Sequence, residues 1–175
     1  KAVAKTVAQV IDQLGVPSDV PIGIAMPAPM RHDVIGFMAN LDQKWVGKNA
    51  RRVFEKQLGR PVSVLNDADA AGVAEHAFGA AKGVDGTVIV TTLGTGIGSA
   101  LIHDGVLVPN TELGHVELDG RDAETHAAAS QRTKQSLSWD EWGARLDRYY
   151  RHLEMLFSPD LIVVGGGVSK NHGEF

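Results

Sequence analysis

A strand-forming segment interrupted by closely spaced glycines places the strongest limit on the fold of this chain. Residues 87–101 read TVIVTTLGTGIGSAL, with Gly94, Gly96 and Gly98 at alternate positions between two apolar runs. Because the second run continues as a strand pattern, we predict a β-hairpin at this point and not a strand-to-helix turn. The spacing G-x-G-x-G also differs from the dinucleotide fingerprint G-x-G-x-x-G, which argues against a Rossmann domain.

Strands and helices are predicted to alternate along the rest of the chain, which favours an α/β fold with a mixed sheet. Apolar runs predict buried strands at residues 20–26, 62–65 and 161–164. Apolar residues at helical spacing, and an alanine-rich stretch, predict helices at residues 3–14, 45–58, 68–80 and 139–157. A change of composition at residues 83–86 divides a small N-terminal domain, residues 1–84, from a larger domain, residues 85–175.

The composition excludes several classes of protein. The absence of cysteine excludes disulfides and thiolate metal sites. The 17 basic and 21 acidic residues are intermixed and leave a net charge of −4, without a basic block that could follow a nucleic-acid backbone. No apolar run approaches the roughly 20 residues that cross a bilayer, and the first residues lack the pattern of a signal peptide. We therefore expect a soluble cytoplasmic protein with no nucleic-acid or membrane partner.

Two polar residues follow one of the predicted strands. Asn66 and Asp67 come directly after the apolar run 62–65 and open a predicted helix. The carboxyl ends of strands are where α/β sheets expose their ligands, so the Asp67 carboxylate is a candidate catalytic base. Aspartate is also among the most favourable helix N-caps, and the local sequence leaves a purely structural role open.

Two glycine-rich segments are candidate anion sites. Glycines in the loop Gly94-Thr95-Gly96 allow a ligand to approach the backbone and can direct successive N–H groups at an anion, as a polyphosphate requires. The second segment, Gly165-Gly166-Gly167, follows the run 161–164 and would suit a nucleotide or the far part of a phosphate chain. A glycine hairpin without a ligand, and a tight strand-to-helix connection, are the structural alternatives.

A third polar motif lies in a predicted loop. Glu112 and His115 flank Gly114 and can offer hydrogen-bond acceptors and donors to vicinal hydroxyls. As metal ligands they are incomplete, because the zincin signature H-E-x-x-H requires two histidines on a helix. We predict no protein metal site, and an ordinary solvated loop is the alternative.

Together and in this order, the motifs resemble the ROK family of sugar kinases, and within it the polyphosphate glucokinase branch. The phrases VLNDADAAG, TLGTGIGSALI, DGVLVPNTELGHVELDG and the tail SWDEW…SPDLIVVGGGVSK carry the resemblance, which covers roughly residues 20–170. It implies an actin-like, hexokinase-type (ribonuclease H-like) α/β fold of two domains with mixed sheets. The chain is expected to be a fragment that lacks the N-terminal strand hairpin and the C-terminal end.

The resemblance implies roles for the sugar-binding residues. Asp67 would be the catalytic base on the sugar 6-hydroxyl, with Asn66 beside it. Glu112, His115 and Glu124 would hold ring hydroxyls.

It implies roles for the donor-binding residues as well. Gly94, Thr95 and Gly96 would cradle the transferred phosphoryl group, and residues 165–167 would form the distal donor site. Asn40 resembles a family residue near the sugar.

The chain also departs from the family pattern. The D-x-G-G-T turn, which binds phosphate and metal in the family, has no counterpart before Lys1. The zinc-binding cysteine cluster of many members is missing as well, which points to the polyphosphate branch. Asn110 stands where the family signature has glycine.

The implied reaction is phosphoryl transfer from inorganic polyphosphate, or ATP, to glucose, which gives glucose 6-phosphate. Mg²⁺ would accompany the donor, and a homodimer is expected. The alternatives are the ligand domain of a ROK sugar-responsive repressor, an ATP-dependent hexokinase for another hexose, and a non-catalytic sugar-binding domain. The sequence leaves open which donor is preferred and whether mannose is accepted.

Overall fold

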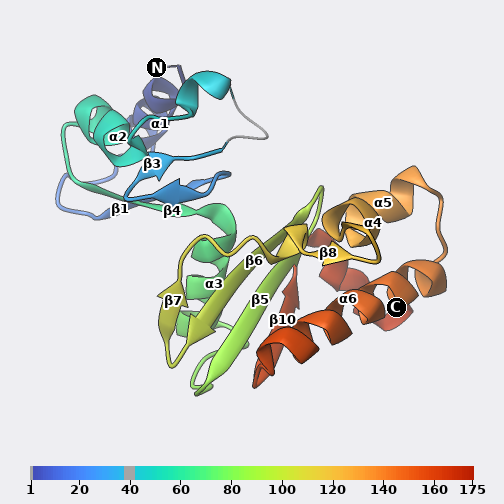
Figure 1. Ribbon diagram of the computed structural model, residues 1–175. Helices are drawn as coiled ribbons and strands as arrows, with labels where there is room; N and C mark the ends of the chain where they lie inside the picture. Colours follow the sequence, from blue (N-terminus) through green and yellow to red (C-terminus); the bar gives the residue numbers. More distant parts are fainter. Residues whose placement is uncertain (1, 38–41) are drawn as a thin grey trace. The chain divides into compact units, whose positions relative to one another are not determined.

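The computed structural model describes residues 2–37 and 42–175, which divide into two compact units (Figure 1). Unit 1 comprises Lys1–Asp67 and unit 2 comprises Ala68–Phe175, so the boundary lies earlier than the predicted one between residues 84 and 85. Helix α3 (Asp67–Phe78) accounts for the difference, because a Cβ on its Gly72 would lie 2.4 Å from the Cβ of Ala100 in the second unit. The helix body therefore packs on the sheet of unit 2.

Unit 1 is built on two parallel strands, β1 (Ile22–Met26) and β4 (Val62–Asn66). They occupy the places where strands were predicted, and Ile22 lies opposite Val62. The other elements of this unit are α1 (Ala2–Gln13), β2 (Met30–Arg31), β3 (Val34–Ile35), the 3-10 turn η1 (Gln43–Trp45) and α2 (Ala50–Leu58).

Helix α2 begins later than predicted. Residues 45–58 were expected to be helical, but the side chain of Asn49 accepts a hydrogen bond from the Arg52 N–H at 2.9 Å and caps a helix that starts at Ala50. Trp45 belongs instead to η1 and stacks on Phe54 with the ring centroids 5.7 Å apart. The end of the helix is as predicted, since Gly59 adopts the left-handed conformation with φ 68°.

Unit 2 contains a four-stranded mixed sheet in the order β10-β5-β6-β7. Strands β5 (Thr87–Leu93) and β6 (Ile97–His103) form the antiparallel hairpin that the glycine pattern predicted. The short strand β7 (Val106–Val108) extends it on one side, and β10 (Leu161–Gly165) pairs in parallel with β5 on the other.

Both faces of this sheet are covered, which explains why β5 is buried along most of its length. Alternate residues such as Ile89 and Leu93 join one core with Trp142 and Tyr149 of helix α6 (Trp139–Phe157). Their neighbours Val88 and Val90 belong to a second core with residues of β6. In Figure 1, α3 and α6 lie on opposite sides of the sheet.

Short elements connect β7 to α6 and follow β10. These are η2 (Leu113–His115), β8 (Glu117–Leu118), β9 (Arg121–Asp122), α4 (Glu124–Ala127), α5 (Ala129–Lys134) and η3 (Gly167–Glu174). Helix α6 has the predicted bounds because Ser138 and Glu141 form a capping box before its first turns. Among the described residues, no helix combines the length and apolarity that crossing a membrane requires.

Candidate functional site

The carbonyl groups of the glycine loop between β5 and β6 all accept hydrogen bonds. The main-chain N–H of Ser130 donates to Gly94 O at 3.0 Å, and its hydroxyl donates to Thr95 O at 2.7 Å. The Gly94 N–H is used within the loop, donating to Gly96 O at 2.9 Å. No described residue accepts a hydrogen bond from the main-chain N–H groups of Thr95 and Gly96. These two donors remain for an anion, as the phosphate-loop hypothesis requires.

Glu124 connects this loop to the segment that follows β7. Its Oε2 accepts a hydrogen bond from the buried Ile97 N–H at 2.8 Å. A Cβ on Gly96 would lie 2.1 Å from the same oxygen, so a larger residue at this position would have to displace the Glu124 carboxylate. Glu124 opens α4, and its own N–H donates to Oδ1 of Asp122 at 2.9 Å. The sequence motif did not indicate this contact with the glycine loop.

The segment with Glu112 and His115 packs against the first residue of β6. A Cβ on Gly114 would lie 2.2 Å from Ile97 O, so the two backbones touch. The Leu113 N–H donates to the Ser99 hydroxyl at 2.8 Å, and Leu113 itself is buried. The two flanking side chains, Glu112 and His115, are exposed beside this buried residue. The predicted sugar-binding pair therefore lies next to the glycine loop.

His115 is held by a carboxylate that the motif analysis missed. Its Nδ1 lies 2.7 Å from Oδ2 of Asp122, and this hydrogen bond raises the pKa of His115. Partial burial opposes the shift, while the charges of Asp122, Glu124 and Glu112 add to it. Because the folded pKa is the higher one, the pair stabilises the fold below about pH 6.5, and that contribution is lost as the pH rises through the folded value.

The second glycine segment lies beside the first. Gly165 is opposite Thr92 in the parallel pairing of β10 with β5, so both glycine segments follow the carboxyl ends of neighbouring strands. Gly166 has φ 93° and ψ 171°, and a Cβ there would lie 2.3 Å from Leu93 O. This close approach fixes the turn at residues 165–167 against the start of the glycine loop.

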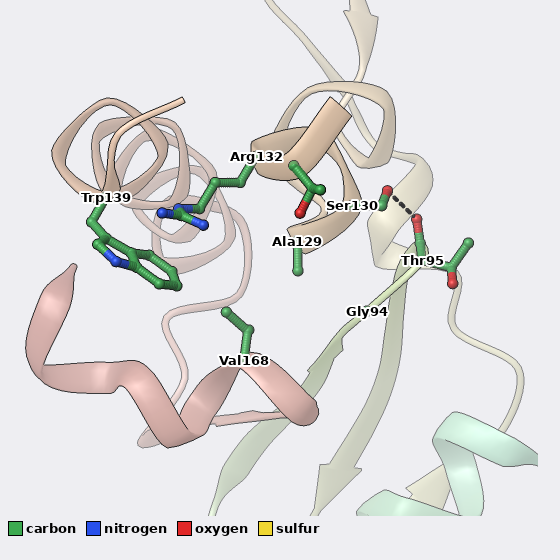
Figure 2. Close-up of a pocket in the computed structure, with 8 residues that line it drawn as sticks. Gly94, Thr95, Ala129, Ser130, Arg132, Trp139 and Val168 are labelled. Carbon is green, nitrogen blue, oxygen red and sulfur yellow. Dashed lines mark hydrogen bonds between the residues drawn. The ribbon is translucent and has the colours of Figure 1, made fainter. Parts of the chain in front are cut away.

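A cavity of about 360 Å³ opens between the first glycine loop, helix α5, Trp139 and Val168 (Figure 2). Its lining residues are Gly94, Thr95, Ala129, Ser130, Arg132, Thr133, Trp139 and Val168. The guanidinium of Arg132 lies 3.4 Å from the centroid of the Trp139 ring. Trp139 belongs to the SWDEW segment of the family resemblance, but no motif singled out Arg132, because the two residues meet only through the packing of α5 against the start of α6.

The remaining predicted residues belong to unit 1 or lie outside the described residues. Asn66 is buried at the end of β4, opposite Met26, and Asp67 is the exposed first residue of α3. Asn40 lies outside the described residues. Unit 2 thus brings together the glycine segments, Glu112, His115 and Glu124, while the place of Asn66 and Asp67 in the site stays a prediction.

Known proteins are similar to this chain in sequence and fold. A sequence profile of the ROK family matches residues 1–128. The polyphosphate glucokinase of Mycobacterium tuberculosis (strain CDC 1551 / Oshkosh) is 44% identical over 170 residues, which are 97% of this chain and 63% of that protein. The chain therefore spans less than two thirds of the length of this relative.

Solved structures agree with the sequence matches. The inorganic polyphosphate/ATP-glucomannokinase from Arthrobacter sp. strain KM is 50% identical, with a TM-score of 0.91 over 99% of this chain and 70% of that one. A ROK family transcriptional regulator, a homologue of the MLC protein of E. coli, has a TM-score of 0.83 over 98% of this chain and 56% of that one. At 17% identity the regulator shows a shared fold only.

These similarities confirm the predicted mixed α/β fold of the actin-like, hexokinase type. The family profile covers well over half of the chain, and the same sequence carries the glycine loop and the Glu112–His115 motif. The chain belongs to the ROK family.

Proposed function

We propose that the protein containing this chain transfers a phosphoryl group from inorganic polyphosphate, or from ATP, to the 6-hydroxyl of glucose. The observation that carries the proposal is the loop at Thr95 and Gly96, whose N–H groups have no described acceptor and whose glycines admit a close ligand. The names of the mycobacterial and Arthrobacter relatives support polyphosphate as donor and glucose as acceptor.

The polar groups near the loop suit a sugar. Glu112, His115 and Glu124 supply carboxylate oxygens and an imidazole, which match the hydroxyls of a hexose ring. The Asp122 hydrogen bond orients the His115 ring and keeps its other nitrogen for a ligand. In this proposal, Asp67 accepts the proton of the 6-hydroxyl as the oxygen attacks the terminal donor phosphorus, and the bond from that phosphorus to its bridging oxygen breaks to release the shortened polyphosphate or ADP.

Positioning and charge stabilisation would supply most of the rate acceleration, because phosphoryl transfer passes through a loose transition state. The N–H groups of Thr95 and Gly96 would donate to the oxygens of the transferred group. The described residues contain no group of three or more His, Asp or Glu placed to hold a metal ion. We therefore propose that Mg²⁺ is bound chiefly through donor phosphate oxygens and neutralises their charge.

The test is a glucose phosphorylation assay of the full-length protein with polyphosphate and with ATP, each at saturating glucose. Glucose 6-phosphate is the expected product, and a repressor or sugar-binding domain would form none. Mannose in place of glucose tests the hexose preference. A homodimer in the cytoplasm remains a proposal from the family resemblance, and sedimentation analysis tests the dimer.

Asp67→Asn tests the base. We expect turnover to fall by about 100-fold or more, since a positioned general base contributes roughly that much. Asp12→Asn is a matched control, because Asp12 is an exposed aspartate on α1 far from the motifs in the sequence. Unchanged thermal unfolding shows that Asp67→Asn keeps the fold, and near-normal turnover in that variant would refute the role.

A further inference from the structure

The cavity beside the glycine loop is lined by a single charged side chain. Of the eight described residues that line it, Arg132 carries a positive charge and none carries a carboxylate. None of the ion pairs among the described residues involves Arg132. Its Nε is buried and has no hydrogen-bond partner among the described residues. The Arg132 guanidinium, which no described carboxylate neutralises, thus lies in the same cavity wall as the glycine loop, whose Thr95 and Gly96 N–H groups have no described acceptor.

Arg132 is held in place by an aromatic platform. Its guanidinium stacks over Trp139, 3.4 Å from the ring centroid, as Figure 2 shows. Trp139 in turn packs against Trp142 and Phe175, with centroids 5.9 and 5.8 Å apart. A stacked guanidinium keeps its N–H groups in the plane of the fork, so their edges can still donate to an acceptor.

This arrangement suits phosphate oxygens better than an aromatic base. The planar fork of arginine matches the geometry of phosphate and forms charge-assisted, bidentate hydrogen bonds with it. An adenine ring could stack on the same face of Trp139 only by displacing the guanidinium. The cavity wall opposite the glycine loop therefore presents the Arg132 cation. A nucleotide base would instead need the face of Trp139 that Arg132 covers.

We propose that Arg132 binds the phosphate chain of inorganic polyphosphate, beyond the group held at Thr95 and Gly96, and so favours this donor over ATP. The inference rests on the proposed function and deepens it by naming a residue that determines donor specificity. The alternative is a structural role, in which Arg132 only packs α5 against Trp139.

Kinetics of the full-length protein separate these roles. Arg132→Gln removes the charge, Arg132→Lys keeps it without the fork, and Arg151→Gln removes a charge from an exposed ion pair with Asp147 on α6. We expect Arg132→Gln to raise the KM for polyphosphate about tenfold or more, with a smaller rise for ATP and an unchanged KM for glucose. Arg132→Lys should be intermediate, and Arg151→Gln should match the unmodified protein.

A binding measurement tests the same contact without turnover. Isothermal titration of inorganic tripolyphosphate should show about tenfold weaker binding to Arg132→Gln than to Arg151→Gln. Thermal unfolding of each variant checks the fold, and Arg132→Lys carries the test if the glutamine variant unfolds.

The results separate the inference from the proposed function. A polyphosphate KM within twofold of the unmodified value in Arg132→Gln, or an equal rise in the KM for ATP, overturns the role of Arg132. If the unmodified protein phosphorylates glucose with neither donor, the proposed function is wrong. Tripolyphosphate binding then still decides whether Arg132 holds a phosphate chain.

Discussion

The replacement Gly166→Ala is expected to destabilise unit 2 strongly. The backbone at Gly166 has φ 93° and ψ 171°, a region that is almost restricted to glycine. A Cβ would lie 2.3 Å from the oxygen and 2.7 Å from the nitrogen of Leu93. Both are main-chain atoms at the end of β5, where Leu93 is fully buried, so they cannot yield as a flexible side chain would.

The magnitude follows from these two effects. Holding an alanine in this backbone region costs about 1–3 kcal/mol. Forcing an extra carbon into a packed site costs about 1–3 kcal/mol more, so the free energy of unfolding should fall by about 2–6 kcal/mol. Because natural domains are stable by only about 5–15 kcal/mol, this is a large fraction of the total.

Urea unfolding followed by tryptophan fluorescence measures the effect, since Trp139 and Trp142 report on unit 2. Gly167→Ala is the matched control, because its Cβ would meet nothing within 4 Å and its φ is not positive. That variant should stay within about 0.5 kcal/mol of the unmodified protein. If Gly166→Ala proved as stable as Gly167→Ala, the close packing of the second glycine segment against β5 would be refuted.

Two further substitutions test the hydrogen bonds of the site. Asp122→Asn should lower the pKa of His115, because it removes the carboxylate that raises this pKa. An NMR titration measures the change, and His126, whose pKa is lowered by burial and should stay so, is the internal control. Glu124→Ala leaves the buried Ile97 N–H without its acceptor and should lower the free energy of unfolding by about 1–3 kcal/mol. Glu124→Gln keeps an acceptor and should lower it less, so equal unfolding free energies for the two variants would contradict this account.

Local patterns predicted the longer elements around the site, β5, β6, β10 and α6, but not the short ones between β6 and α6. The alternation of apolar residues with glycines at 94, 96 and 98 predicted the β5–β6 hairpin, because strand character resumed after the loop. The helical spacing predicted α6 with its observed bounds. The start of α2 was wrong because apolar spacing continues through Trp45, while the Asn49 side chain supplies the cap that starts the helix.

The same local patterns did not predict the contacts between segments that are distant in the chain. Asp122 reaches His115 and Glu124 reaches Ile97 because β8, β9 and α4 fold back over the glycine loop. Arg132 lines the cavity only because α5 packs beside Trp139. No local spacing encodes these approaches, so Glu124 was named as a candidate without its partner, and Asp122 was missed.

The sequence by itself determined the order of the longer strands and helices, the glycine-bearing hairpin and the polar motifs, since each depends on residues close together in the chain. Only the tertiary structure decided which N–H groups of the loop remain for an anion, how the second glycine segment packs on Leu93, and which cation lines the cavity. The physical reason is that backbone conformation follows local sequence, whereas hydrogen-bond partners and cavity walls are set by segments that meet only on packing.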